Sequence, residues 1–139
     1  MSIAAWCHGL RAGHHFTADP QVEKAAALEL ADRAARLNAG DPMAETMLAA
    51  AYTLTHDLRA AAVHVDRALT LDGGSAWAWG RSGFVKAYRG CAREAIEEFQ
   101  IASTVGHDPA VQWVIDDHAM ALQAGSGHHP TSELRISFC

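Results

Sequence analysis

The sequence predicts an all-α protein in which about seven helices pair as antiparallel hairpins. Three observations predict this fold. A motif returns with a 34-residue period, most expected helices begin at an Asp or a Ser, and alanine supplies much of the 50% hydrophobic content. Alanine has the highest helix propensity and suits closely packed helices better than a sheet core. A length of 139 residues corresponds to one domain.

The 34-residue period is visible in aligned columns. Asp32-Arg33-Ala34 returns as Asp66-Arg67-Ala68, and the column continues at Gln100-Ile101-Ala102. The other columns with this spacing are Ala27, Ala61 and Ala95, then Ala31, Val65 and Phe99, and finally Leu37, Leu71 and Val105. Three aligned units indicate a repeated helical hairpin rather than a chance match.

The unit around Gly83 shows how such a hairpin packs. Gly83 and Ala95 have almost no side chain, so the two helices can approach closely where they cross. Trp79 and Phe99 are large and fill the space beside that contact. We therefore expect Trp79 and Phe99 to be buried inside the hairpin.

The expected helices begin at N-cap residues, namely Asp19, Asp41, Asp57, Ser75 and Asp108. Asp19, Asp41 and Asp108 each precede a proline, which favours the first helical position. The helices are expected at residues 2–14, 20–38, 42–55, 58–71, 76–89, 92–105 and 109–123. The connection between the first two is about six residues longer than the later hairpin turns. In helix 20–38 the inward residues are expected to be Leu28, Ala31, Ala34 and Leu37.

Two regions follow from this pattern. Residues 1–124 form the repeat domain, with about three and a half hairpins. Residues 125–139 change composition and lose helical periodicity, so a disordered tail is expected there.

A 34-residue period with helix-turn-helix content resembles the tetratricopeptide repeat. The resemblance covers residues 2–124 and is best in 76–109. It implies a short right-handed α-solenoid in which the first helix of each hairpin lines a concave groove that binds a peptide or another helix. The sequence departs from the family where a proline is usual, at Ala39, Gly73 and His107, and at Lys86, where an aromatic residue is usual.

The segments Asp66-Arg-Ala-Leu-Thr-Leu71 and Ser75-Ala-Trp-Ala-Trp-Gly80 also resemble the C-terminal repeat segments of bacterial adenylate and guanylate cyclases and of winged-helix regulators. Neither a cyclase nor a DNA-binding domain lies in these residues. That resemblance therefore implies only that the chain acts as an adaptor segment.

The predicted groove is apolar and aromatic. Trp77, Phe84 and Tyr88 share one face of helix 76–89, and it differs from the face of Trp79 and Gly83. By the 34-residue spacing, the groove residues are Trp6, Leu10, Met43, Ala50, Leu54, Trp77, Phe84, Tyr88, Val111 and His118. The alternative is that these side chains only pack one repeat against the next.

No pattern predicts catalysis or a cofactor. The sequence has no glycine-rich phosphate loop, no Gly-x-Ser-x-Gly turn and no His-Glu-x-x-His. Histidines gather near Cys7, at His8, His14 and His15, and near Asp117, at His118. None has the spacing of a structural zinc site, so no metal ligand is assigned.

Charge and cysteine content bear on partners and location. The net charge of −5 is made of interspersed signs, so neither nucleic acid nor a membrane is an expected partner. The N-terminus does not have the pattern of a secretory signal. The three cysteines, Cys7, Cys91 and Cys139, fit reduced thiols and a cytoplasmic protein.

We interpret the chain as a non-enzymatic protein-interaction module. The alternative is a regulatory or oligomerising segment of a signalling protein, and a third hypothesis is histidine-dependent metal binding. Helix 109–123 has apolar residues on more than one side, including Val114 and Ile115. Association through this helix, with a second copy or with sequence beyond this chain, is therefore expected.

Overall fold

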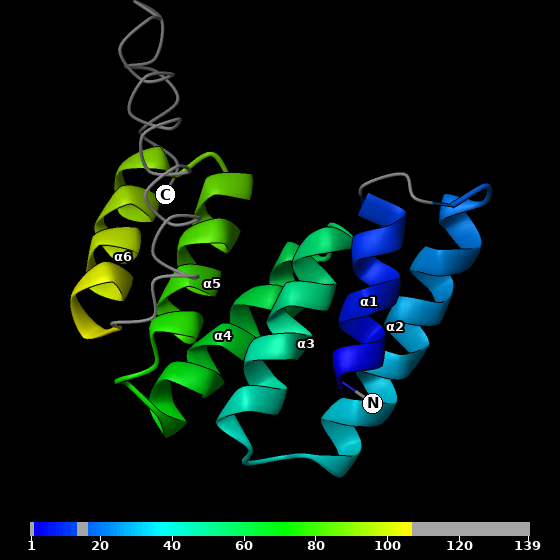
Figure 1. Ribbon diagram of the computed structural model, residues 1–139, viewed down its shortest axis with the longest axis horizontal. Coiled ribbons are helices and arrows are strands. Elements are labelled where there is room, and N and C mark those ends of the chain that lie inside the picture. Colours follow the sequence, from blue (N-terminus) through cyan, green and yellow to red (C-terminus); the bar gives the residue numbers. More distant parts are fainter. Residues whose placement is uncertain (1, 14–16, 107–139) are drawn as a thin grey trace, which may run out of the picture. The chain divides into compact units, whose positions relative to one another are not determined.

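The computed structural model describes residues 2–13 and 17–106 (Figure 1). These ranges contain six α-helices and no strand, which confirms the all-α prediction. The helices are α1 (Ser2–Gly13), α2 (Pro20–Leu37), α3 (Pro42–Leu54), α4 (Leu58–Leu71), α5 (Ala76–Tyr88) and α6 (Ala92–Val105). The seventh expected helix, 109–123, and the tail 125–139 lie outside the described residues.

The chain divides into two compact units, Met1–Gly73 and Gly74–Cys139. In the first unit, α1 packs against α2 and α3 against α4, while α3 also contacts both helices of the preceding hairpin (Figure 1). In the second unit, α5 pairs with α6. A single repeat domain over residues 1–124 stays a prediction.

The helix starts lie where the sequence places them. The side chains of Asp19, Asp41, Asp57 and Ser75 each accept a hydrogen bond from a backbone N–H in the first turn of the following helix. These bonds satisfy amide groups that have no partner within the helix. Pro20 and Pro42 occupy the first helical position, as expected.

Residues that are equivalent by the 34-residue period also share their degree of burial. Three of the aligned columns are buried in every hairpin: Ala27, Ala61 and Ala95; Ala31, Val65 and Phe99; Ala34, Ala68 and Ala102. The fourth column, Leu37, Leu71 and Val105, is exposed in every hairpin. The expectation that Leu37 points inward is therefore wrong, because Leu37 is the last residue of α2 and the chain turns away there.

Gly83 and Phe99 form the close helix crossing of the third hairpin. A Cβ added to Gly83 would lie 2.6 Å from Cε1 of Phe99, which is closer than real Cβ contacts come. Phe99 is fully buried with Ala95 and Ala102, and Trp79 packs against this cluster while remaining partly accessible. The predicted packing is thus confirmed for Phe99 and holds in part for Trp79.

The turns within two hairpins share a backbone conformation. His56, between α3 and α4, has φ 63°, and Gly90, the equivalent residue one period later between α5 and α6, has φ 84°. This left-handed region suits glycine and costs an L-residue about 1–2 kcal/mol. The second hairpin therefore holds a strained residue where the third has glycine.

The described cysteines differ in accessibility. Cys7 is a free, exposed thiol. Cys91 is buried directly before α6. Within the described ranges, every helix is too short or too polar to cross a membrane.

Candidate functional site

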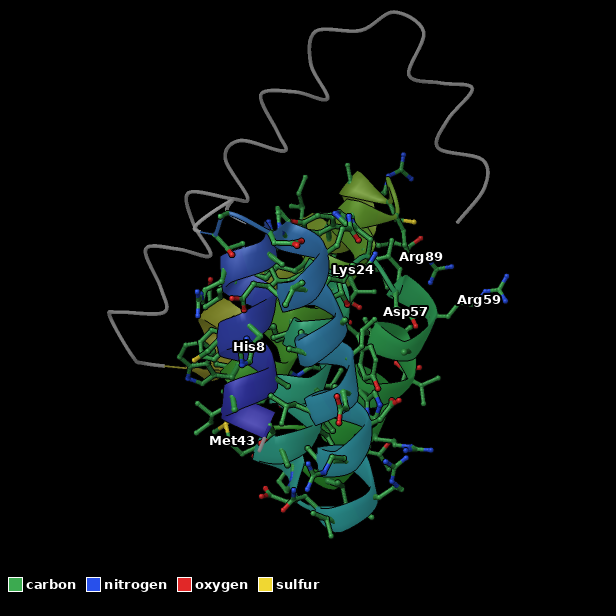
Figure 2. All side chains as sticks on the ribbon, turned by 90° about the vertical axis from the view of Figure 1, so that its right-hand side faces the viewer. His8, Lys24, Met43, Asp57, Arg59 and Arg89 are labelled. Atoms are coloured by element: carbon green, nitrogen blue, oxygen red, sulfur yellow. The ribbon has the colours of Figure 1, made fainter. Side chains whose placement is uncertain are left out.

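The predicted groove residues of the first unit differ in accessibility. Met43, labelled in Figure 2, is half exposed at the start of α3. Trp6, Leu10 and Leu54 are partly buried, and the Cβ of Leu54 lies 3.4 Å from the point where a Cβ on Gly9 would stand. Ala50 is fully buried and does not line an open groove. It belongs to the face of α3 that packs against the other helices of this unit.

In the second unit, two of the three predicted aromatic residues are open to solvent. Trp77 and Tyr88 are exposed on α5. Phe84 instead packs edge-on against Phe99, with ring centroids 5.2 Å apart and an interplanar angle of 76°. The guanidinium carbon of Arg81 lies 5.4 Å from the centroid of the Phe84 ring. Phe84 therefore belongs largely to the hairpin core, and Val111 and His118 lie outside the described residues.

Ile3, Met43 and Trp77 are equivalent side chains. Met43 and Trp77 are one period apart, and Ile3 takes the same position once the longer first connection is counted. All three are exposed, by 62%, 50% and 38%. The first helix of each described hairpin thus presents a large apolar side chain to solvent at the same place.

A buried polar network joins the two helices of the second hairpin. The Nδ1–H of His64 donates to Oε2 of Glu45 at 2.6 Å, and both side chains are buried. The imidazole also stacks on the ring of Tyr52, with centroids 5.2 Å apart and an interplanar angle of 5°. The hydroxyl of Tyr52 in turn donates to Oδ1 of Asp32 on α2 at 2.6 Å. The chain of contacts therefore connects α2, α3 and α4.

Burial shifts the pKa of Tyr52. Loss of solvation raises the pKa of its hydroxyl well above the ordinary value of about 10, and the hydrogen bond and negative charge of Asp32 raise it further. The neutral phenol is therefore the form that this site holds. It acts as a hydrogen-bond donor that fixes Asp32 and orients the ring on which His64 stacks.

In the third hairpin, a different interaction joins the positions equivalent to Tyr52 and His64. Lys86 and Glu98 stand one period after Tyr52 and His64, and Lys86 Nζ lies 3.1 Å from Glu98 Oε1. Lys86 also contacts Glu94 at 3.1 Å. An ion pair thus occupies the positions that an aromatic stack occupies in the second hairpin.

Sequence reasoning missed the Glu45–His64 pair, and the repeat register does not mark it. Trp79 and Glu98 stand one period after Glu45 and His64. The equivalent residues of the first hairpin are Ala5 and Leu30, when the longer connection is counted. A His–carboxylate pair at these two register positions is therefore found only in the second of the described hairpins, and the repeated architecture alone does not require it.

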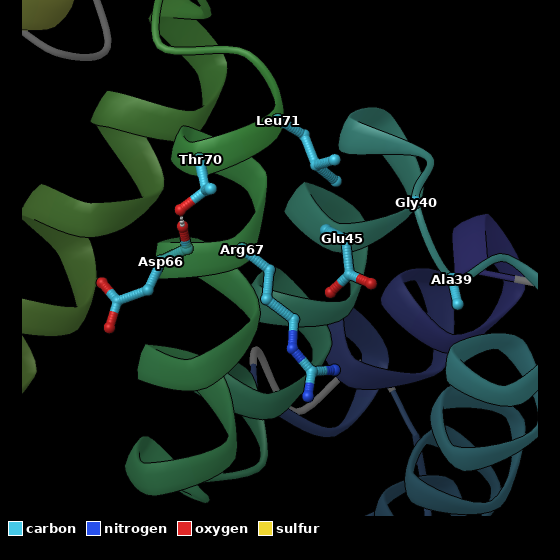
Figure 3. Close-up of a pocket in the computed structure, with 7 residues that line it drawn as sticks. All are labelled: Ala39, Gly40, Glu45, Asp66, Arg67, Thr70 and Leu71. Carbon is cyan, nitrogen blue, oxygen red and sulfur yellow. Dashed lines mark hydrogen bonds between the residues drawn. The ribbon is translucent and has the colours of Figure 1, made fainter.

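A recess of about 510 Å³ opens beside Glu45 (Figure 3). It lies between the start of α3, the end of α4 and the loop before α3. The residues that line it are Ala39, Gly40, Glu45, Asp66, Arg67, Thr70 and Leu71. The recess therefore combines a short aliphatic wall with one buried carboxylate and two exposed charged residues.

A second His–carboxylate contact lies in the first hairpin. His8 on α1, labelled in Figure 2, is hydrogen-bonded through Nδ1 to Oε2 of Glu23 on α2. Arg11 Nη2 lies 3.0 Å from Oε1 of the same carboxylate. Both oxygens of Glu23 are therefore occupied, and this cluster ties α1 to α2.

The described residues do not assemble a metal site. Within 2–13 and 17–106, no three His, Cys, Asp or Glu side chains are grouped so that they could hold an ion. Of the histidines considered as metal ligands, His8 is instead engaged with Glu23, and His14, His15 and His118 lie outside the described ranges.

Comparison with known proteins gives no assignment. No family model matches the sequence, and no curated protein matches it. The resemblance to tetratricopeptide repeats accordingly stays a prediction. It is carried by the 34-residue register and by nothing outside the chain.

Proposed function

We propose that this chain is a non-enzymatic protein-interaction module that binds a peptide or a helix through apolar side chains on the first helix of each hairpin. The observation that carries the proposal is the exposed column of Ile3, Met43 and Trp77. Large apolar side chains that recur on a surface are typical of protein-binding sites, and tryptophan is enriched among the residues that dominate binding energy.

The packing within the first unit supports a stacked-hairpin arrangement. α3 contacts both α1 and α2, so the first helix of the second hairpin rests on the whole preceding hairpin. In a solenoid of such hairpins, equivalent positions of successive repeats lie along one surface. The proposed fold is therefore a short tetratricopeptide-like solenoid, with its partner bound along the first helices.

Exposed apolar residues also occur on the second helices, and they provide a matched control. Val22 on α2 is 62% exposed, Val63 on α4 is 49% exposed and Ile101 on α6 is 37% exposed. These fractions match those of Ile3, Met43 and Trp77 almost one for one. Nonspecific hydrophobic binding would depend equally on both sets of side chains. Binding as proposed depends only on Ile3, Met43 and Trp77.

The test selects ligands and then compares two triple variants. A displayed library of random 16-residue peptides is panned against the full chain, and the affinity of enriched peptides is measured by fluorescence anisotropy. The triple variant Ile3→Ser, Met43→Ser and Trp77→Ser should weaken binding at least about tenfold, which corresponds to about 1.4 kcal/mol. The triple variant Val22→Ser, Val63→Ser and Ile101→Ser should bind as the wild type does.

The proposal would be contradicted if both triple variants lost the same affinity for the peptide. It would also be contradicted if the variant of Ile3, Met43 and Trp77 lost none. Sedimentation equilibrium of the wild type then tests the alternative of an oligomerising segment. A mass that rises with concentration, and that the first triple variant abolishes, would identify a second copy of this chain as the partner.

A further inference from the structure

We propose that the recess beside Glu45 is a binding site for a primary ammonium group carried on an aliphatic stem. The proposal concerns the α3–α4 hairpin and does not depend on the interaction surface of the first helices. It rests on the one oxygen of the buried Glu45 carboxylate that has no partner among the described residues, and on the lining of the recess.

Glu45 presents one open oxygen to the recess. Its side chain is 3% exposed, and Oε2 accepts the hydrogen bond from His64. No hydrogen bond or ion pair joins Oε1 to the described residues, and Oε1 is not among their fully buried side-chain atoms that lack a partner, so it keeps a small contact with solvent. Figure 3 shows the carboxylate directed into the space between the ends of α3 and α4.

The buried carboxylate of Glu45 has a single hydrogen-bond partner, so its Oε1 oxygen stays in a poorly solvated place without a compensating donor among the described residues. A cation at Oε1 offsets that cost, and a hydrogen bond in which both groups are charged is about twice as strong as a neutral one. The electrostatic preference of the site is therefore for a cation over a neutral or anionic group.

The single open oxygen suits an ammonium group, although a guanidinium makes a comparable single contact at Glu23. A guanidinium group pairs best when it engages both oxygens of a carboxylate. His64 already occupies Oε2 of Glu45, so only a single contact is open. An ammonium group acts as a compact point charge and loses nothing from a single contact.

The remaining lining suits an aliphatic stem. Ala39, Leu71 and the methyl group of Thr70 supply apolar surface, and a volume of about 510 Å³ lies within the usual range for small-ligand sites. The carboxylate of Asp66 points away from Glu45 (Figure 3), and Arg67 adds a positive charge that opposes the cation. Arg67 has no ion pair with Glu45, so it leaves the carboxylate open.

The test measures binding of n-pentylamine to the full chain by protein-observed NMR at neutral pH. The signals of residues lining the recess should shift with n-pentylamine, and n-pentanol and pentanoate should produce no saturable shift. Glu45→Gln, which keeps an acceptor for His64, should weaken binding at least about tenfold. Glu97→Gln, an exposed change of equal charge on α6, is the control and should leave binding unchanged.

Two variants of exposed residues keep the test decisive if Glu45→Gln fails to fold. Ala39→Trp should block the recess and abolish the shifts, and Arg67→Gln should raise the affinity several-fold by removing the opposing charge. The proposal is overturned if n-pentylamine gives no saturable shift with the wild type, if Ala39→Trp binds as well as the wild type, or if Arg67→Gln binds more weakly.

One further probe identifies the source of the ammonium group. An Ala-Lys-Ala peptide, acetylated and amidated at its ends, carries the same group on a protein backbone. Tighter binding of this peptide than of n-pentylamine would identify a lysine side chain as the ligand. Equal or weaker binding would identify a free alkylamine, and both results support the ammonium site.

Discussion

Tyr52 and His64 stack nearly parallel across the α3–α4 hairpin, with ring centroids 5.2 Å apart and an interplanar angle of 5°. Their counterparts in the next hairpin, Lys86 and Glu98, meet as an ion pair at 3.1 Å. Two unrelated interactions therefore bridge the same pair of positions, which indicates that the hairpins share a geometry although their sequences differ there.

The Tyr52 contact predicts a loss of stability at alkaline pH. Its pKa is raised in the folded chain, so between pH of about 10 and the folded pKa the unfolded chain loses a proton that the folded chain keeps. The folded state binds more protons in that window, and its free energy of unfolding should fall as the pH rises above about 10. Below a pH of about 10, Tyr52 is neutral in both states, and its full contribution to the free energy of unfolding is present.

Tyr52→Phe removes this titration. The variant should be less stable than the wild type at pH 7 by about 1 kcal/mol, because the hydrogen bond to Asp32 is lost. Its stability should then fall less steeply from pH 9 to pH 11, as measured by urea unfolding. A residual slope is expected from Lys86. Desolvation lowers its pKa, but hydrogen bonds and charge interactions with Glu94 and Glu98 raise it overall, so the folded chain also holds this proton more tightly than the unfolded chain does. Equal slopes in variant and wild type would contradict the assignment.

The crossing at Gly83 predicts a graded response to side-chain size. A Cβ at this position meets the ring of Phe99, and overpacking of a core costs about 1–3 kcal/mol or more. Gly83→Ala gains up to about 1 kcal/mol of helix propensity, so its net destabilisation should be small, whereas Gly83→Leu should cost several kcal/mol. Urea unfolding measures both. Gly73→Ala, where a Cβ meets only ordinary contacts, is the control, and a neutral Gly83→Leu would show that the crossing is misplaced.

The aligned turns predict a stabilising substitution. His56 has a positive φ where the third hairpin has Gly90, so His56→Gly should raise the free energy of unfolding by about 0.5–1 kcal/mol. Gly90→Ala should lower it by a similar amount. Thermal unfolding followed by circular dichroism checks both variants. Destabilisation by His56→Gly would mean that the His56 side chain contributes more than its backbone strain costs.

Two large side chains of the third hairpin should respond oppositely to truncation. Phe99 is fully buried, and Phe99→Ala should cost about 3–5 kcal/mol. Trp77 is exposed, and Trp77→Ala should change the melting temperature little. Differential scanning calorimetry of the two variants measures this contrast. A larger loss for Trp77→Ala would mean that Trp77 packs one repeat against another instead of serving a partner.

The helical hairpins could be predicted from the sequence because the residues that determine them lie close together in the chain. Asp19, Asp41, Asp57 and Ser75 cap helices through neighbours in the chain. The buried columns follow from helical periodicity within one hairpin. The register alone thus predicted the six described helices and the crossing at Gly83.

The site was harder to predict, because accessibility depends on contacts between helices that are distant in sequence. Ala50 and Phe84 share a register position, and the helical pattern placed both in the groove. Ala50 is instead buried, and Phe84 turns toward Phe99. The Glu45–His64 pair escaped notice because neither residue type nor local spacing marks a contact between residues 19 positions apart.

The two tryptophans of α5 allow the most direct test of the proposed function. Trp77 is exposed, whereas Trp79 packs against the Phe99 cluster. The full chain is labelled with 5-fluorotryptophan, its ¹⁹F signals are assigned with single Trp→Phe variants, and a selected peptide is titrated in. The account predicts a saturable shift of the Trp77 signal, with the Trp79 signal unmoved. A shift of Trp79 without Trp77, or saturable binding that moves neither, would contradict it.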